Sequence, residues 1–297
     1  MIRHVAMCGL VACWAATAAA EDVVRLGNLK FAHYGAVSFM KEMGAKYGLR
    51  IEERVFPKGI DIIPGILAGE IDIAASAADS AIAGRAAGAP VFAVAGFAKG
   101  GARIIGRADL GLHSVADLRG KRVGVPRGGA QEILLYAELN QALMQKQIDA
   151  MCQSEPQSTQ ALVHGIGNEI AKPYHTPLGE PVRVMVMTEK LYSNHDLALR
   201  VMKCFVDATR HFMDDPALAE RYVREQMFRG QLTPREYRDA MANAAFTYDL
   251  AAEHIQVTTD LMVKYGVGKL KNPPQATNWV RLDLLRQAKA ALGISEK

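Results

Sequence analysis

Residues 67–80 read LAGEIDIAASAADS, and this stretch decides the fold of the chain. Gly69 ends a predicted helix, residues 71–75 form a short apolar run, and small polar residues follow that run. A continuous apolar run of this length is typical of a strand that is buried on both faces of a parallel sheet. The stretch therefore predicts a helix, a buried strand and a polar loop at the carboxyl end of that strand.

A similar pattern returns at residues 143–158, which read LMQKQIDAMCQSEPQS. Ile148 and Asp149 align with Ile71 and Asp72, and each copy follows a predicted strand, a glycine-containing loop and a helix. Two similar α/β halves therefore follow one another along the chain. We interpret the repeated aspartate as structural, with a carboxylate that accepts hydrogen bonds from the backbone N–H groups of a neighbouring loop.

Strands and helices alternate from residue 23 to about residue 190, which predicts mainly parallel sheets with helical crossovers. From about residue 195 the spacing of apolar residues predicts helices alone. A turn of helix is expected at residues 114–118, with Ser114 as its cap. The predicted strands are residues 23–26, 50–56, 71–75, 90–96, 103–105, 121–125, 148–152 and 182–187.

The first 20 residues predict a cleaved secretory signal peptide. Arg3 and His4 form a basic start, residues 5–16 are apolar without acid or base, and alanines at 18–20 suit a signal peptidase. The apolar run is too short to anchor the chain across a bilayer. Residues 10–13, LVAC, offer a second route, because they resemble the box at which bacterial lipoproteins are cleaved and lipidated on Cys13. Either route predicts an exported protein.

Composition and charge describe a globular chain. Half of the 297 residues are hydrophobic and 22% are charged, and the net charge of +4 is spread over lysines and arginines that lie among acids. This balance argues against a nucleic-acid partner. Only Cys152 and Cys204 remain after residue 20, and they form either one disulfide or two separate thiols.

With these motifs in order, the chain resembles the periplasmic substrate-binding proteins of ABC importers of the nitrate, sulfonate and taurine type. The resemblance implies an α/β, two-lobed, type II periplasmic-binding-protein fold, in which each lobe is a mainly parallel sheet flanked by helices and a helical C-terminal region follows. It also implies a periplasmic monomer that traps a small, anionic ligand and delivers it to a membrane permease. Besides the two repeated phrases, the resemblance rests on GAPVFAVAGF (88–97), Ile104-Ile105-Gly106, SVADLRGKRVGVPRGGAQEILL (114–135) and VRVMVMTEKLY (182–192).

The expected division gives lobe I residues 21–102 plus 188–297 and lobe II residues 103–187. Lobe II is the shorter one, since the interval from residue 123 to 148 is about half of the matching interval from 24 to 71. We expect it to lack one strand and part of its crossovers, with residues 130–146 as a single helix. A missing strand can leave its neighbour unpaired.

The candidate ligand-binding residues lie in the loops after the strands. At the carboxyl ends of parallel strands, free N–H groups and helix N-termini favour a negatively charged ligand. Solvated loops and helix caps are the alternative interpretation of the same residues. The candidates are Asn28, Lys30 and His33; Ser76, Asp79 and Ser80; Arg127, Gly128, Gly129 and Ala130; and Gln153 and Glu155.

Signatures of catalysis are absent from the sequence. It contains no His-Glu-x-x-His, Cys-x-x-Cys, Gly-x-Ser-x-Gly or phosphate-binding Gly-x-x-x-x-Gly-Lys motif, so we expect no enzyme activity, metal or cofactor. A more distant resemblance to thiamine-pyrimidine synthases leaves an enzyme on the same scaffold as an alternative, although their cysteine-rich run is missing. A remnant whose shortened second lobe no longer binds a ligand is the other alternative.

Overall fold

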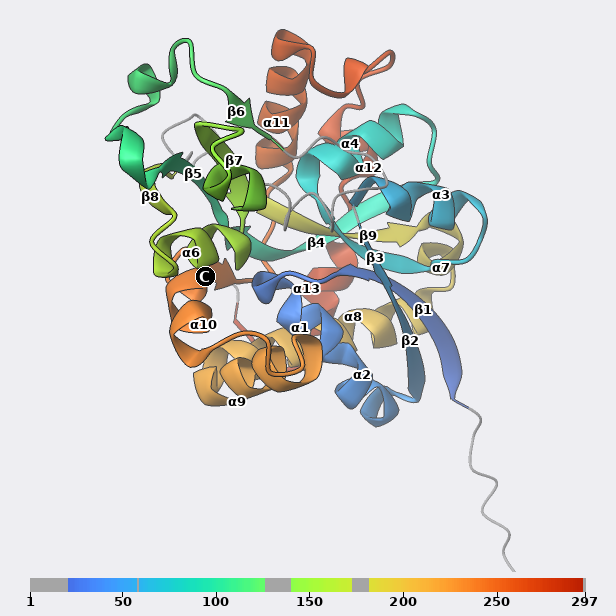
Figure 1. The fold of residues 1–297 in the computed structure, drawn as a ribbon. Coiled ribbons are helices and arrows are strands. Elements are labelled where there is room, and N and C mark those ends of the chain that lie inside the picture. The colour runs from blue at the N-terminus through green and yellow to red at the C-terminus, as the bar shows by residue number, and fades with distance from the viewer. Residues whose placement is uncertain (1–20, 58, 126–139, 173–181, 296–297) are drawn as a thin grey trace, which may run out of the picture.

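The computed structural model describes residues 21–57, 59–125, 140–172 and 182–295. Within them the chain forms two β-sheets with helices packed around both (Figure 1). This mixed α/β architecture with two sheets confirms the fold class expected from the sequence. The predicted signal peptide and the candidate residues Arg127, Gly128, Gly129 and Ala130 lie outside the described residues.

The larger sheet has six strands in the order β10-β4-β9-β3-β1-β2. β1 pairs in parallel with β2 and β3, whereas β9 runs antiparallel to both β3 and β4. The three central strands are almost wholly apolar, as expected for strands covered on both faces. The strands are β1 (Asp22–Leu29), β2 (Leu49–Phe56), β3 (Ile73–Ala77), β4 (Val91–Gly100), β9 (Val182–Thr188) and β10 (Ala244–Phe246).

The smaller sheet has four strands in the order β6-β7-β5-β8. β6 and β7 are parallel, and β5 is antiparallel to both β7 and β8. The chain enters this sheet directly from β4 and returns to the larger sheet in β9. The strands are β5 (Ala102–Arg107), β6 (Val123–Gly124), β7 (Ala150–Ser154) and β8 (Gly167–Ala171).

The two sheets share one plan. In the larger sheet the parallel pair β1 and β3 is followed by the antiparallel strand β9, and in the smaller sheet β6 and β7 are followed by the antiparallel strand β5. β2 extends the larger sheet beyond β1, but no strand pairs beyond β6 in the part of the chain that the structure describes. Residues 140–144 are helical. The shortening of lobe II and the lobe boundaries stay predictions.

The repeated aspartate makes the same contacts in both copies. Asp72 Oδ2 accepts a hydrogen bond from the backbone N–H of Arg25 at 2.9 Å, and Asp149 Oδ2 accepts one from that of Arg122 at 3.0 Å. Both arginine side chains also pair with the same carboxylates. The backbone carbonyl of each aspartate accepts from the end of the neighbouring antiparallel strand, at Thr188 or Arg107. The structural role predicted for these aspartates is confirmed, although the backbone donor to Asp72 lies in strand β1 and not in a loop.

Helices surround the larger sheet. In Figure 1, α1, α2, α8 and α13 lie below it, and α3, α4 and α11 lie above it. The α-helices are α1 (Gly35–Ser38), α2 (Met40–Met43), α3 (Ile62–Leu67), α4 (Ala78–Ala86), α6 (Gln157–Val163), α7 (Glu189–Ser193), α8 (His195–Asp214), α9 (Pro216–Arg221), α10 (Pro234–Met241), α11 (Ala252–Tyr265), α12 (Ala276–Trp279) and α13 (Asp283–Ala291).

Shorter helical turns complete the chain, and one of them confirms a sequence-based prediction. Ser114 and Asp117 form a capping box at the start of η5, which agrees with the predicted cap. The other turns are 3₁₀ helices apart from η6, which is a π-helix. They are η1 (Ala32–Tyr34), η2 (Gly44–Tyr47), η3 (Gly59–Asp61), η4 (Ala108–Leu110), η5 (Val115–Leu118), η6 (Tyr222–Met227) and η7 (Val267–Lys269).

Two strands differ from the sequence-based expectation. The region after residue 195 was predicted to hold helices alone, but β10 lies within it and pairs antiparallel with the end of β4. β8 was not predicted, and its sequence GNEIA carries residue types that are rare in strands. Both strands lie at sheet edges, where pairing with a long neighbour decides the conformation more than local propensity does.

The core is unevenly divided. One large cluster fills the space around the six-stranded sheet and includes the fully buried Tyr34, Phe97, Phe205 and Trp279. Among the described residues, the four-stranded sheet has two small clusters, of which one is built on Ile105, Leu143, Met151 and Ala161. Most of the hydrophobic stabilisation that the described residues supply therefore belongs to the larger sheet and its helices.

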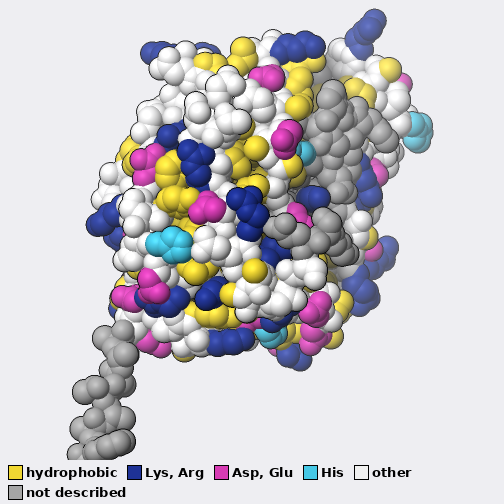
Figure 2. All heavy atoms as spheres, turned by 180° about the vertical axis from the view of Figure 1, so that it is seen from behind, with side chains coloured by type: hydrophobic (Ala, Val, Ile, Leu, Met, Phe, Trp, Pro, Cys, Tyr) yellow, Lys and Arg dark blue, Asp and Glu magenta, His cyan; other side chains and the backbone are white. Residues whose placement is uncertain are grey.

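Cysteines and surface charge agree with the expectations from composition. Cys152 in β7 and Cys204 in α8 are free thiols, so the alternative of a disulfide between them does not apply. On the face shown in Figure 2, basic and acidic side chains are intermixed and the basic ones do not gather into one patch. None of the described helices is both long and apolar enough to span a membrane.

Candidate functional site

A cavity of about 1180 Å³ opens where the ends of strands from both sheets meet. Ala77, the last residue of β3, and Ser154, the last residue of β7, both line it. The segment after β1 adds Phe31 and, from η1, His33 and Tyr34. The two copies of the repeat therefore end at one common cavity, which is the arrangement that the sequence predicted for a cleft between two lobes.

His33 is a fully buried polar side chain in the wall of this cavity. Its exposed fraction is 0%, and Arg183 Nε lies 3.5 Å from His33 Nε2. Burial, with a smaller contribution from the nearby Arg183 charge, holds the pKa of His33 well below its usual value of 6.5. His33 is therefore neutral at neutral pH, and an imidazole that accepts at Nε2 carries its proton on Nδ1, a buried atom that finds no hydrogen-bond partner among the described residues.

Arg183 brings a positive charge into the wall of the cavity. It stands in β9, paired in register with Ala77 of β3 on one side and Ala98 of β4 on the other. In the described ranges no carboxylate forms an ion pair with its guanidinium. A guanidinium among apolar neighbours attracts an anion more strongly than one in open water, because the local dielectric constant is lower.

The first turn of α4, which follows directly on Ala77, also contributes to the lining of the cavity. Asp79 and Ser80 lie in that turn, and both line the cavity. The exposed Asp79 opposes the charge of Arg183, whereas Lys269 of η7 supplies a second positive charge to the lining. Among the described lining residues, the cavity thus combines two cations and one carboxylate with a wall that is mostly apolar.

Three of the described candidate residues line the cavity, namely His33, Asp79 and Ser80. Three others are buried and make contacts within the protein. Asn28 Nδ2 donates to Glu53 at 2.7 Å, Ser76 Oγ donates to the carbonyl of Ala77 at 3.1 Å, and Gln153 Oε1 accepts from the backbone N–H of Ser154 at 3.1 Å. Their predicted role in ligand binding stays a prediction.

Lys30 lies at a second, smaller cavity of about 220 Å³. Phe31 lines both cavities. The ammonium group of Lys30 stands 5.2 Å from the centre of the Phe228 ring, a cation–π distance. This side chain therefore contacts the region after η6 and does not line the main cavity.

Glu155 joins the two sheets. Its side chain is fully buried, Oε1 accepts from Arg103 Nε at 2.6 Å and from Asn243 Nδ2 at 2.8 Å, and Oε2 accepts from the backbone N–H of Thr159 at 3.1 Å. Arg103 also pairs with Glu169 and donates to the backbone carbonyl of Asp239 in α10. Because Asn243 directly precedes β10, this network connects the crossover between the sheets to the C-terminal helices.

Sequence reasoning did not select Arg183, Phe31 or Tyr34. Arg183 had a detectable signal, since a single arginine inside the otherwise apolar run of residues 182–187 is unusual for a buried strand. Phe31 and Tyr34 had none, because aromatic residues near a strand end are equally common in a core. The described residues hold no cluster of three or more His, Cys, Asp or Glu side chains that suits a metal ion.

Comparison with known proteins supports the sequence-based resemblance. Residues 45–166, which run from the larger sheet into the smaller one, match the family model described as NMT1/THI5 like. The alkanesulfonate-binding protein SsuA from Xanthomonas axonopodis pv. citri, bound to MOPS, is 19% identical with a TM-score of 0.72, over 89% of this chain and 100% of that one. No curated protein matches by sequence.

Two further solved structures are similar. The ligand-binding component of an ABC-type import system from Staphylococcus aureus, with zinc bound, is 18% identical with a TM-score of 0.74, over 90% of this chain and 99% of that one. The periplasmic nitrate-binding protein NrtA from Synechocystis PCC 6803 is 14% identical with a TM-score of 0.72, over 92% and 89%. At these identities the comparison shows a shared fold, that of periplasmic binding proteins.

Proposed function

We propose that this chain is the exported solute-binding component of an ABC importer and that it holds a small, anionic ligand in the cavity between the two sheets. The observation that carries the proposal is the position of Arg183, whose guanidinium lies in the wall where β3 and β7 both end. His33, neutral and buried in the same wall, accepts a hydrogen bond from Arg183 Nε at Nε2 and so helps to orient the guanidinium. The similar structures include sulfonate- and nitrate-binding proteins.

The proposed mechanism is a population shift between open and closed lobes. A ligand that contacts lobe I at His33 and lobe II at Ser154 favours the closed state by its extra contacts, and the permease recognises that state. The network of Arg103, Glu155 and Asn243 fixes the crossover about which the lobes would move. The ligand leaves unchanged, so the proposal includes no catalytic step.

Export and delivery belong to the same proposal. A cleaved signal at residues 1–20 would place a monomer in the periplasm, and lipidation at Cys13 would instead tether it to the membrane. Expression in a Gram-negative host followed by osmotic shock separates these outcomes, since a soluble periplasmic protein is released and a lipoprotein stays with the membrane fraction. Size-exclusion chromatography with light scattering tests whether the protein is a monomer in solution.

Ligand binding is tested with Arg183→Gln and a matched control. Arg286 is an exposed arginine of α13 and lies outside the cavity lining, so Arg286→Gln removes the same charge elsewhere. Native mass spectrometry of the purified protein identifies any small molecule that co-purifies, and calorimetry with that molecule gives its affinity. Losing a charge-assisted contact worth roughly 1.5–3 kcal/mol predicts at least about a tenfold weaker affinity for Arg183→Gln and no change for the control.

Three outcomes would contradict the proposal. If Arg183→Gln and the wild type bind the ligand with equal affinity, Arg183 does not contact the ligand. A failure of the purified protein to bind any organic or inorganic anion would favour the non-binding remnant. Conversion of the bound molecule into a product would favour an enzyme on the same scaffold.

A further inference from the structure

The main cavity opens to the surface between two exposed segments. Val267 of η7 and Val125, which follows β6, both line the cavity, and their exposed fractions are 48% and 45%. The cavity therefore reaches the surface between the C-terminal helices and the edge strand of the smaller sheet. We call this opening the mouth, and its two sides the η7 rim (residues 263–271) and the β6 rim (residues 119–125).

The η7 rim is apolar and basic. It reads VKYGVGKLK, and no acidic residue occurs between residues 261 and 282. Tyr265 is 68% exposed and Val263 is 52% exposed, so large apolar side chains stand in water beside the lysines. Lys264 Nζ lies 5.3 Å from the centre of the Tyr265 ring, a cation–π distance. The exposed side chains of this rim are Val263, Lys264, Tyr265, Val267, Lys269 and Lys271.

The β6 rim has a similar composition. It reads RGKRVGV, and Val123 and Val125 are exposed among its basic residues, of which Arg122 already pairs with Asp149. The described residues expose eleven large apolar side chains, and five of these belong to the two rims. Single exposed apolar residues are ordinary, whereas such clustering marks a surface that meets another apolar surface.

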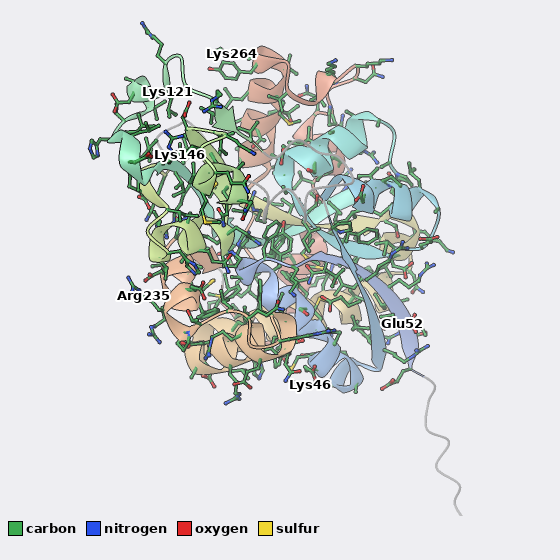
Figure 3. All side chains as sticks on the ribbon, viewed as in Figure 1. Lys46, Glu52, Lys121, Lys146, Arg235 and Lys264 are labelled. Atoms are coloured by element: carbon green, nitrogen blue, oxygen red, sulfur yellow. The ribbon has the colours of Figure 1, made fainter. Side chains whose placement is uncertain are left out.

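The other basic residues of the rims are available to an external partner. Among the residues that the structure describes, no carboxylate forms an ion pair with Lys264, Lys269 or Lys271, nor with Arg119 or Lys121. Figure 3 shows Lys264 and Lys121 at the same, upper end of the molecule, which is seen edge-on at the top of Figure 2. A flat, negatively charged surface can therefore meet both rims at once.

We propose that the mouth docks on an anionic lipid bilayer, with the basic residues at the lipid phosphates and the apolar side chains of the η7 rim among the headgroups. Tyrosine and lysine are both favoured at the membrane–water interface. An acidic protein surface fits less well, because lysine is depleted in protein–protein interfaces. Docking places the mouth of the cavity against the membrane. The inference does not depend on which ligand the cavity holds.

The test is cosedimentation with vesicles of phosphatidylcholine alone or mixed with an equal amount of phosphatidylglycerol. The protein begins at Glu21, so that neither the apolar segment before it nor a lipid on Cys13 contributes, and it keeps both sheets and all the described core clusters. Each cation near an anionic surface contributes about fivefold, so the three lysines of the η7 rim predict about a hundredfold stronger binding to the mixed vesicles. Added salt is expected to abolish this difference.

Variants outside the cavity lining locate the effect. Lys264→Gln combined with Lys271→Gln is expected to weaken binding to the mixed vesicles about twentyfold. Tyr265→Ser is expected to weaken it about fivefold and to leave the salt dependence unchanged, since it removes only apolar contact. Lys190→Gln combined with Arg286→Gln is the control, because it removes two exposed charges from α7 and α13. Thermal unfolding midpoints verify that each variant is folded.

Three outcomes would overturn the inference: no binding to the mixed vesicles at low salt, equal binding to both kinds of vesicle, or unchanged binding by the double lysine variant. The partner of the rims would then be an acidic protein surface. Arg183→Gln is expected to bind vesicles as the wild type does, since Arg183 lies in the cavity wall. A protein that binds vesicles but no small anion would therefore refute the proposed function and leave this inference standing.

Discussion

Replacing Glu155 with Gln is expected to destabilise the protein strongly, although it removes only one charge. Glu155 is fully buried and shares Oε1 between Arg103 and Asn243, so the variant leaves the guanidinium of Arg103 buried with one fewer negative partner. Breaking a buried ion pair costs about 3–5 kcal/mol. We expect the lower end, about 3 kcal/mol, because Glu169 still pairs with Arg103 and is partly exposed.

The assay is urea denaturation followed by far-UV circular dichroism, with thermal unfolding as a second measurement. A loss of about 3 kcal/mol corresponds to a melting temperature lower by about 6–12 °C for a chain of this size. Glu52→Gln is the control, since Glu52 pairs with Arg50 on the surface of β2 and an exposed pair contributes at most about 1 kcal/mol.

A double variant tests the physical reason. Arg103→Met combined with Glu155→Gln removes both charges, so no unpaired charge remains buried, and we expect at least half of the lost stability to return. The reasoning would be refuted if the free energy of unfolding of Glu155→Gln lay within about 1 kcal/mol of the wild-type value, or if the double variant were no more stable than Glu155→Gln alone.

Further predictions concern pH and packing. Burial lowers the pKa of His33 in the folded state, so as the pH falls below 6.5 the unfolded state takes up a proton before the folded state does. The stability of the wild type relative to His33→Asn should therefore fall as the pH drops through 6.5, and a constant difference in melting temperature would contradict this. Hydrogen bonds from Arg122 lower the pKa of Asp149 in the folded state, so the contribution of its carboxylate to folding stability is complete above pH 3.8 and is lost as the pH falls further. The melting temperatures of the wild type and Asp149→Asn should therefore converge only below pH 3.8. Gly96→Ala should cost about 1–3 kcal/mol in urea denaturation because the added methyl would lie 2.2 Å from the carbonyl oxygen of Asp249, and an unchanged midpoint would show that the loop moves freely.

The repeat in the sequence predicted the plan of the fold, because it reflects a physical requirement in each half. A buried strand next to a carboxylate that accepts a backbone N–H recurs at Asp72 and Asp149, and the structure places both copies in equivalent positions of the two sheets. Short apolar strands and glycine-terminated helices are local signals. They are therefore readable without tertiary information.

Edge strands and buried charges could not be read in the same way. β8 and β10 are held by pairing with β5 and β4, which lie far from them in sequence. Glu155 has the sequence environment of a loop residue, and only the fold brings Arg103 and Asn243 to it. Residue type and spacing do not distinguish a carboxylate that faces a ligand from one that is buried in an ion pair.

The most direct test of the account is the position of the bound ligand. The protein is crystallised with the small molecule that native mass spectrometry identifies, and the difference density is examined in the cavity between the two sheets. The account predicts an anionic group within hydrogen-bonding distance of Arg183, between the ends of β3 and β7. Density confined to another surface, with the cavity holding only water, would contradict it.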